Sequence, residues 1–210
     1  MGAGEEYLCL VSNQADAGAV VIGVPAWVDE LAPAGTLLES DDARMELVIA
    51  LSARNVAEGG GPFAAAVFEG ARLMAAGVNR VLESGLSIAH GEIVALMRAQ
   101  QTARDLERAT ADGPTTGPLT LVTTTEPCCQ CFGALIWSGA NRLVCGATTA
   151  DAESIGFDEG PKPERWPEVL EKRGIAVTLN VRRDAAKRVI EEYARLGGPI
   201  YGLRHPTIHA

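Results

Sequence analysis

The stretch TTTEPCCQCFGALIW, residues 123–137, joins a run of β-forming residues to an apolar helical pattern. Residues 119–124 are typical of a strand, Pro127 stands where a helix begins, and residues 128–138 continue that helix. Two thiols three residues apart on a helix project to the same side. We therefore expect a strand followed by a helix whose first turn presents Cys128 and Cys131 together.

Strand and helix patterns alternate on both sides of this stretch. Strands are predicted at residues 63–69, 71–76, 119–124, 142–146 and 176–181, and helices from 41 to the glycines at 59–61 and at 90–108, 128–138, 166–173 and 182–196. The first two strands are so close in sequence that they can pair only antiparallel, whereas helical crossovers make strands parallel. We therefore expect a mixed five-stranded sheet with helices on both faces. Residues 79–87 and 151–163 are predicted as loops, and 19–24 as a short strand.

The composition fits one globular domain and disfavours a polyanionic partner. The 210 residues include 18 Lys and Arg against 27 Asp and Glu, a formal net charge of −9, and 47% are hydrophobic. Nucleic-acid binders normally gather a basic excess that displaces counterions from phosphates. A small or neutral ligand is therefore expected, and no nucleic acid.

The expected compartment of the protein decides whether its cysteines are thiols or disulfides. The longest apolar run, residues 19–27, is too short and too interrupted by Pro and Gly to cross a bilayer, and residues 1–6 are acidic where a secretory signal is basic. We therefore expect a cytoplasmic protein without membrane contact, whose five cysteines are thiols. Cys9 and Cys145 are expected to be buried as small hydrophobic residues.

A second motif, His90-Gly91-Glu92, opens the helix at 90–108. His90, Cys128 and Cys131 together offer three ligands for zinc (Zn2+), which leaves the fourth tetrahedral position for water, as in catalytic sites. Zinc lowers the pKa of such a water from about 9 to about 7. Glu92 is then the expected base toward the water and acid toward a leaving amine. A C-x-x-C pair also occurs in structural zinc and redox sites, and Cys129 could replace either neighbour as a ligand.

Together, H-x-E and P-C-x-x-C are the signature of zinc-dependent nucleobase deaminases, and the chain resembles the cytidine/deoxycytidylate deaminase superfamily over about residues 41–201. Within it, residues 61–63, 79, 125–128, 132–137 and 155–161 resemble bacterial guanine deaminases and the related guanine/s-triazine (ammeline) deaminases. The resemblance implies a three-layer α-β-α cytidine-deaminase-like fold and hydrolytic deamination of a free aminated base, with zinc as cofactor. It also implies a deaminase domain at residues 41–196, between an N-terminal extension at 1–40 and a tail at 197–210.

The resemblance further assigns roles to single residues. Asn79 is expected to hydrogen-bond the base, Phe63 and Trp137 to wall the pocket, and Glu159 to read the ring edge and relay protons. From the residues alone, Glu159 could equally be a solvated loop acid, and the two aromatic residues ordinary core. Gly91 stands where relatives usually have Ala, which costs up to about 1 kcal/mol of helix propensity and leaves space near the metal.

The resemblance also implies a homodimer whose tail, with Tyr201 and His205, covers the active site of its own chain or of the partner; a frayed end is the other interpretation. Three alternative functions stay open. One is deamination of cytosine or a cytosine analogue. The second is editing of tRNA or DNA, which the net charge disfavours. The third is an inactive zinc-stabilised scaffold, which the intact Glu92 disfavours.

Overall fold

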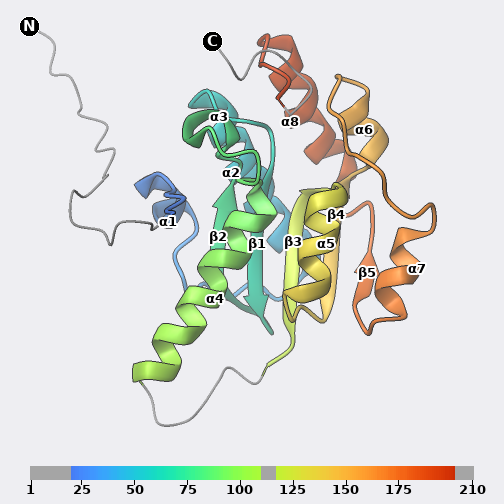
Figure 1. Cartoon of the computed structure of the whole chain (residues 1–210). Helices are drawn as coiled ribbons and strands as arrows, with labels where there is room; N and C mark the ends of the chain where they lie inside the picture. Colours follow the sequence, from blue (N-terminus) through green and yellow to red (C-terminus); the bar gives the residue numbers. More distant parts are fainter. Residues whose placement is uncertain (1–19, 110–116, 202–210) are drawn as a thin grey trace, which may run out of the picture.

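The computed structural model describes residues 20–109 and 117–201 and has a mixed sheet at its centre (Figure 1). The strands lie in the order β2-β1-β3-β4-β5, with bounds β1 (Ala64–Glu69), β2 (Arg72–Val78), β3 (Leu119–Thr125), β4 (Arg142–Ala147) and β5 (Ala176–Thr178). β1 pairs antiparallel with β2 and β3, while the pairs β3–β4 and β4–β5 are parallel. The predicted mixed five-stranded sheet is therefore confirmed.

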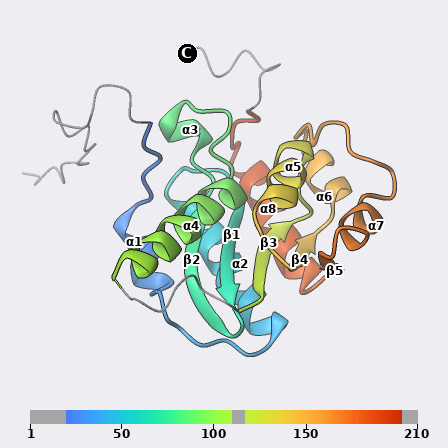
Figure 2. The ribbon, with the colours of Figure 1, turned by 60° about the horizontal axis from the view of Figure 1, so that its bottom comes forward.

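Helices cover both faces of this sheet, so the three-layer α-β-α prediction is also confirmed. Figures 1 and 2 show α4 and α5 over one face, with α2 and α8 over the other. The bounds are α1 (Ala26–Leu31), α2 (Asp41–Ala57), α3 (Val81–Ser84), α4 (Gly91–Ala109), α5 (Cys129–Trp137), α6 (Thr149–Glu153), α7 (Trp166–Glu171) and α8 (Arg183–Arg195). Among the described residues, no helix is long and apolar enough to span a membrane.

The layers follow from the two-residue period of the strands. In β1, Ala65 and Val67 pack into the core shared with α4, α5 and α7, whereas Ala66 and Phe68 pack into the core shared with α2. Both cores are apolar and solvent-free at their centres. Each fully buried Val, Leu or Phe stabilises the fold by about 1.5–3 kcal/mol, so both faces of the sheet need a helical layer.

Three local predictions are wrong. The described part of 19–24, residues 20–24, contains no strand. Helix α3 forms inside the predicted loop 79–87, and helix α6 overlaps the first residues of the predicted loop 151–163. Both helices are only one turn long, too short for an apolar period to reveal them. α6 is stabilised instead by a capping box, in which Thr148 and Asp151 hydrogen-bond each other's backbone N–H groups.

The described part of the N-terminal extension packs against the rest of the chain. Val28 and Ala32 are buried in the α2-side core. Backbone hydrogen bonds join residues 35–38 to β2 and its turn, among them Gly35 N to Leu73 O at 2.8 Å. The predicted boundary at residue 41 therefore does not coincide with a break in packing.

One edge of the sheet gathers the strand ends that carry the predicted motifs. Because β1 runs against both neighbours, its amino end lies beside the carboxyl ends of β2 and β3. Ala64 pairs with Val78, so Phe63 and Asn79 lie side by side, and Asn79 N donates to Phe63 O at 2.9 Å. Ligands of open α/β sheets bind outside the carboxyl ends of strands, so a ligand site is expected at this edge of the sheet.

Candidate active site and metal centre

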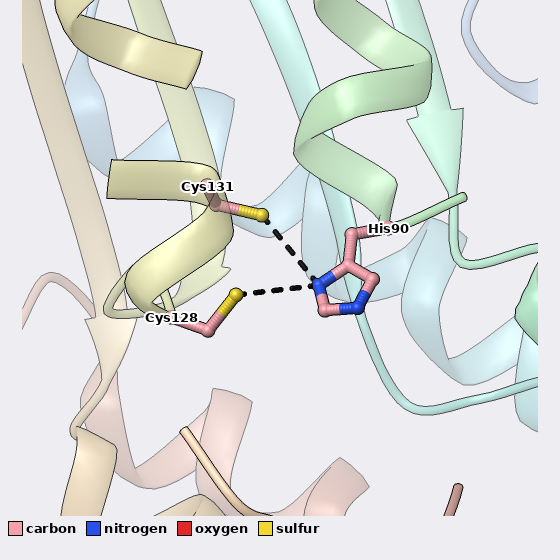
Figure 3. Close-up of side chains that lie close together, drawn as sticks. All are labelled: His90, Cys128 and Cys131. Atoms are coloured by element: carbon pink, nitrogen blue, oxygen red, sulfur yellow. Dashed lines mark hydrogen bonds between the residues drawn. The ribbon is translucent and has the colours of Figure 1, made fainter. Parts of the chain in front are cut away.

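The starts of α4 and α5 bring together the three predicted metal ligands (Figure 3). His90 Nδ1 lies 3.4 Å from Cys128 Sγ and 3.6 Å from Cys131 Sγ, and all three donor atoms lie within 4.8 Å of one another. A tetrahedral zinc with bonds of about 2.0–2.1 Å to nitrogen and 2.3 Å to sulfur separates such donors by about 3.6 Å. The donor set and its spacing therefore fit zinc.

Proton affinities in this cluster reflect its tight packing. A hydrogen bond from Cys131 and the adjacent His90 lower the pKa of the Cys128 thiol to about 4, against the opposing effect of burial. Burial lowers the pKa of His90, but its hydrogen bond with Cys128 and the charge of that thiolate outweigh burial and raise it. A thiolate is thus already favoured without metal, and a coordinated divalent cation favours it further.

Glu92 lies in the first turn of α4, two residues after His90. It is 6% exposed and lines the same cavity as His90 and Cys128. Its Oε1 accepts a hydrogen bond from Thr123 Oγ1 at 3.2 Å. Burial and the nearby charge of Cys128 raise the pKa of the Glu92 carboxyl. The helical geometry thus places a carboxyl of raised basicity beside the metal ligands, as proton transfer requires.

The cavity has a volume of ≈ 90 Å³. Its walls combine aromatic rings with acids and metal ligands: Phe63, Val81, Ser87, His90, Glu92, Thr125, Glu126, Cys128, Phe157, Asp158, Glu159 and Tyr201. Drug-sized ligands occupy about 300–1,000 Å³. This cavity therefore suits a small ring rather than a strand of nucleic acid.

Glu159 reaches this cavity from the segment between α6 and α7 and is 7% exposed. Burial and the charge of Cys128 raise the pKa of its carboxyl to about 8. Its backbone carbonyl accepts from Cys129 N at 2.8 Å, which ties this segment to the start of α5. A buried acid of this kind is a candidate for proton transfer or ligand recognition rather than a solvated loop acid.

Asn79 is 1% exposed and is hydrogen-bonded to two residues that line the cavity, Phe63 and Val81. Its Oδ1 accepts from Val81 N at 3.1 Å, which defines the orientation of the side-chain amide. Its Nδ2 is buried without a hydrogen-bond partner. A buried amide donor without a partner costs about 1–3 kcal/mol, so this group is suited to an acceptor on a ligand.

Two predicted residues have other surroundings. The prediction for Trp137 is wrong in this chain, since Trp137 ends α5 with 85% of its surface exposed and does not line the cavity. Gly91 does not line it either. A Cβ on Gly91 would lie 3.1 Å from Ala64 Cα and 3.2 Å from Phe63 O, so this glycine lets α4 approach the backbone of β1.

Sequence reasoning assigned no role to several lining residues. Phe157 contacts the Phe63 and Tyr201 rings edge to face, with centroids 4.9 and 5.0 Å away. Glu126 Oε2 accepts from Thr149 Oγ1 at 2.8 Å, which holds the β3–α5 connection. Both residues belong to stretches that resemble guanine deaminases. Membership in those stretches is the sequence signal that could have placed them at the cavity.

The free cysteines divide as predicted where the structure describes them. Cys145 is fully buried in the core, and Cys129 is exposed beside the ligand pair. Cys9 lies outside the described residues.

A family model described as the cytidine and deoxycytidylate deaminase zinc-binding region matches residues 38–147. Its match agrees with the fold and the ligand triad, and the chain belongs to the cytidine and deoxycytidylate deaminase family, a class of zinc-dependent deaminases.

Solved structures and a curated relative show which members of this family are similar to the chain. A variant of the protein NE0047 in complex with 8-azaguanine is 46% identical, with a TM-score of 0.78, over 87% of this chain and 99% of that chain. A guanine deaminase from Nitrosomonas europaea is 45% identical, with a TM-score of 0.76, over 84% and 97%. A guanine deaminase from Bacillus subtilis is 31% identical over 102 residues, which cover 48% of this chain and 59% of that protein. Two of these relatives are thus named guanine deaminases.

Proposed function

We propose that this protein is a guanine deaminase that removes the amino group of free guanine, or of a guanine-like purine or amino-s-triazine, as ammonia. The observation that carries this proposal is the small cavity in which Glu92 and Glu159 lie beside the metal ligands. The activity of the relatives at 45–46% identity supports the same substrate class.

His90, Cys128 and Cys131 would hold the zinc ion, and bound zinc supplies a water of lowered pKa as nucleophile. Glu92 would accept a proton from the attacking water as the water oxygen bonds to the amine-bearing carbon. The same carboxyl would then protonate the amine, so that the C–N bond breaks and ammonia leaves. Transfer of the remaining hydroxyl proton to the adjacent ring nitrogen would give the ring carbonyl. Burial of Glu92 excludes competing water and favours both transfers near neutral pH.

Recognition of the ring is assigned to groups around the cavity. Once ionised, the Glu159 carboxyl suits the adjacent N1–H and amino donors of guanine, and its raised pKa also allows it to carry a proton. The Nδ2 of Asn79, buried without a partner, suits a ring acceptor. Phe63 and Phe157 offer apolar walls for the planar base.

The experiment is Glu92→Gln, which keeps the side-chain size and removes the proton acceptor. We expect ammonia release from guanine to fall by about 10²–10⁴-fold, with zinc content unchanged by metal analysis. Undiminished turnover in this variant would contradict the mechanism. Zinc without turnover of any base by the unaltered protein would support an inactive scaffold instead.

Substrate choice is tested with a panel of free bases assayed for ammonia. Guanine is expected to exceed cytosine, because Glu159 is an acceptor for two adjacent donors. Faster turnover of cytosine than of every purine and triazine would favour the cytosine alternative, and binding of tRNA would favour editing.

We also propose a cytoplasmic homodimer. Tyr201 lines the cavity of its own chain, so the tail covers that cavity at least to this residue. His205 and the other residues after 201 lie outside the described part, and exchange of the tail between chains stays a prediction.

A further inference from the structure

Two segments that border the cavity are held from behind by one helix. The loop of residues 60–63 ends at Phe63, and Asn79 directly follows the last residue of β2, Val78. Asn55 of α2 lies between them, is fully buried and does not line the cavity. No step of the proposed reaction uses this polar side chain, so its burial needs an explanation.

Asn55 joins the two segments through its amide. Its Nδ2 donates to Gly61 O at 2.8 Å and to Asn79 O at 3.1 Å. Its backbone carbonyl accepts from Gly60 N at 2.8 Å. One residue of α2 thus makes contact with both cavity-bordering segments, which are otherwise linked by Asn79 N to Phe63 O.

Close packing leaves this amide little freedom. A Cβ on Gly60 would lie 2.5–2.7 Å from the Asn55 amide atoms, so the loop can approach only because residue 60 is glycine. A Cβ on Gly61 would lie 2.0 Å from Tyr201 Oη and 3.1 Å from Asn79 Oδ1. The loop that Asn55 holds therefore also sets the space available to Tyr201 and Asn79.

We propose that Asn55 is a positioning residue for substrate binding: it holds the backbone of Asn79 and the 60–63 loop in the arrangement that directs Asn79 Nδ2 toward the base. This inference rests on the proposed function. It assigns Asn55 an effect on the affinity for the base and none on the proton transfers of Glu92, because the hydrogen bonds of its amide go to residues 61 and 79.

The sharpest test is Asn55→Asp, which keeps the side-chain size but places a carboxylate oxygen opposite two carbonyl oxygens. We expect the KM for guanine and the Kd for 8-azaguanine to rise at least about tenfold, with kcat within about threefold and zinc content unchanged. Where Asn55→Asp does not fold, Asn55→Ala, which removes the donor without adding charge, is measured in its place with the same expectation.

Ser52→Ala is the matched control. Ser52 lies one turn earlier on α2, is fully buried and donates to Pro62 O at 2.6 Å, in the same loop but without a bond to residue 79. We expect it to lower the melting temperature while KM and Kd change less than twofold. Affinity losses that track the melting temperature equally in both variants would overturn the positioning role.

The two proposals fail differently. If the zinc-loaded unaltered protein neither binds 8-azaguanine nor deaminates guanine, the proposed function is wrong and the role of Asn55 falls with it. If the unaltered protein binds and turns over these purines and the Asn55 variants do so with unchanged Kd and KM, only the role of Asn55 is wrong.

Discussion

At the scale of single residues, burial and hydrogen bonding act on different properties of Glu92. Burial raises the pKa of its carboxyl, while the Thr123 hydroxyl donates to Oε1 and orients it. Thr123 is itself 1% exposed, on the strand that leads to the cysteine motif. The basicity and the direction of this carboxyl are thus set by different neighbours.

Thr123→Val replaces the hydroxyl with a methyl group of similar size. Because a hydrogen bond to a charged group contributes about 1.5–3 kcal/mol, we expect kcat for guanine to fall about tenfold or more, with KM and zinc content nearly unchanged. Steady-state kinetics and metal analysis check this. Thr123→Ser retains the donor and should restore most of kcat; equal losses in both variants would argue against the hydrogen bond.

At the scale of elements, Asp151 links α6 to α8 through a capping box and an ion pair. Its Oδ2 accepts from Thr148 N at 2.9 Å and from Arg183 Nε at 2.8 Å. The hydrogen bond from Arg183 contributes most, and those from Thr148 add to it; together they hold the pKa of the Asp151 carboxyl well below its usual range. The segment that leads to Glu159 starts from this anchored helix.

Asp151→Asn should therefore destabilise the fold in a pH-dependent way. At pH 7 we expect a loss of about 1 kcal/mol from the removed negative charge, and no more, because Arg183 is half exposed and solvent screens the pair. Because the pKa of Asp151 is lower in the folded state than in the unfolded chain, where it is about 3.9, ionised Asp151 stabilises the fold at pH values above 3.9. This stabilisation is lost progressively as the pH falls below 3.9. The difference in the free energy of unfolding between the variant and the unaltered protein should therefore be smaller at pH 3 than at pH 7.

Urea unfolding at both pH values measures this gap. Glu192→Gln is the control, because Glu192 pairs with Arg195 on the exposed side of α8. It should leave the free energy of unfolding nearly unchanged, because solvent screens an exposed ion pair. A gap for Asp151→Asn that is constant between pH 7 and pH 3 would contradict the ionic contribution.

At the scale of the whole molecule, the metal joins two helices that approach the sheet edge separately. His90 precedes α4, while Cys128 and Cys131 belong to the start of α5. Binding only to the folded state stabilises by about 4 kcal/mol at a metal concentration a thousand times Kd. We expect chelation to lower the melting temperature by about 10 °C, and added zinc to restore it.

Thermal unfolding with and without chelator measures this shift. Cys129→Ser should retain the full response, because Cys129 is exposed and outside the triad, whereas Cys131→Ser should lose it. A response lost in Cys129→Ser would show that Cys129 is a ligand.

Sedimentation velocity tests the proposed dimer, which should sediment at twice the 22.0 kDa of the chain. Trp137 is the exposed aromatic residue through which α5 would contact a second copy, because burying an indole ring removes a large apolar area from water. Trp137→Glu is then expected to give monomers.

A monomeric unaltered protein at micromolar concentration would refute the dimer, and a dimeric variant would place its interface elsewhere. Monomers that keep full activity would also exclude exchange of the tail as a requirement.

The residues that carry the chemistry could be predicted because their signals are local. The spacing of Cys128 and Cys131 on one helical turn, and of His90 and Glu92 at another helix start, limits the reaction to a few classes whatever surrounds them. The alternation of strand and helix patterns likewise predicted the sheet, since strand faces and helix stripes are properties of consecutive residues.

Tertiary structure alone decided which side chains border the cavity and which stand behind it. Trp137 lies in a stretch that resembles the relatives, yet α5 turns it to solvent. Asn55, in contrast, gave no local signal, because its partners lie 6 and 24 residues away and meet it only through the register of β1 and β2. Hydrogen bonds between distant segments depend on how crossovers and strand pairs close in space, and no spacing along the chain encodes that closure.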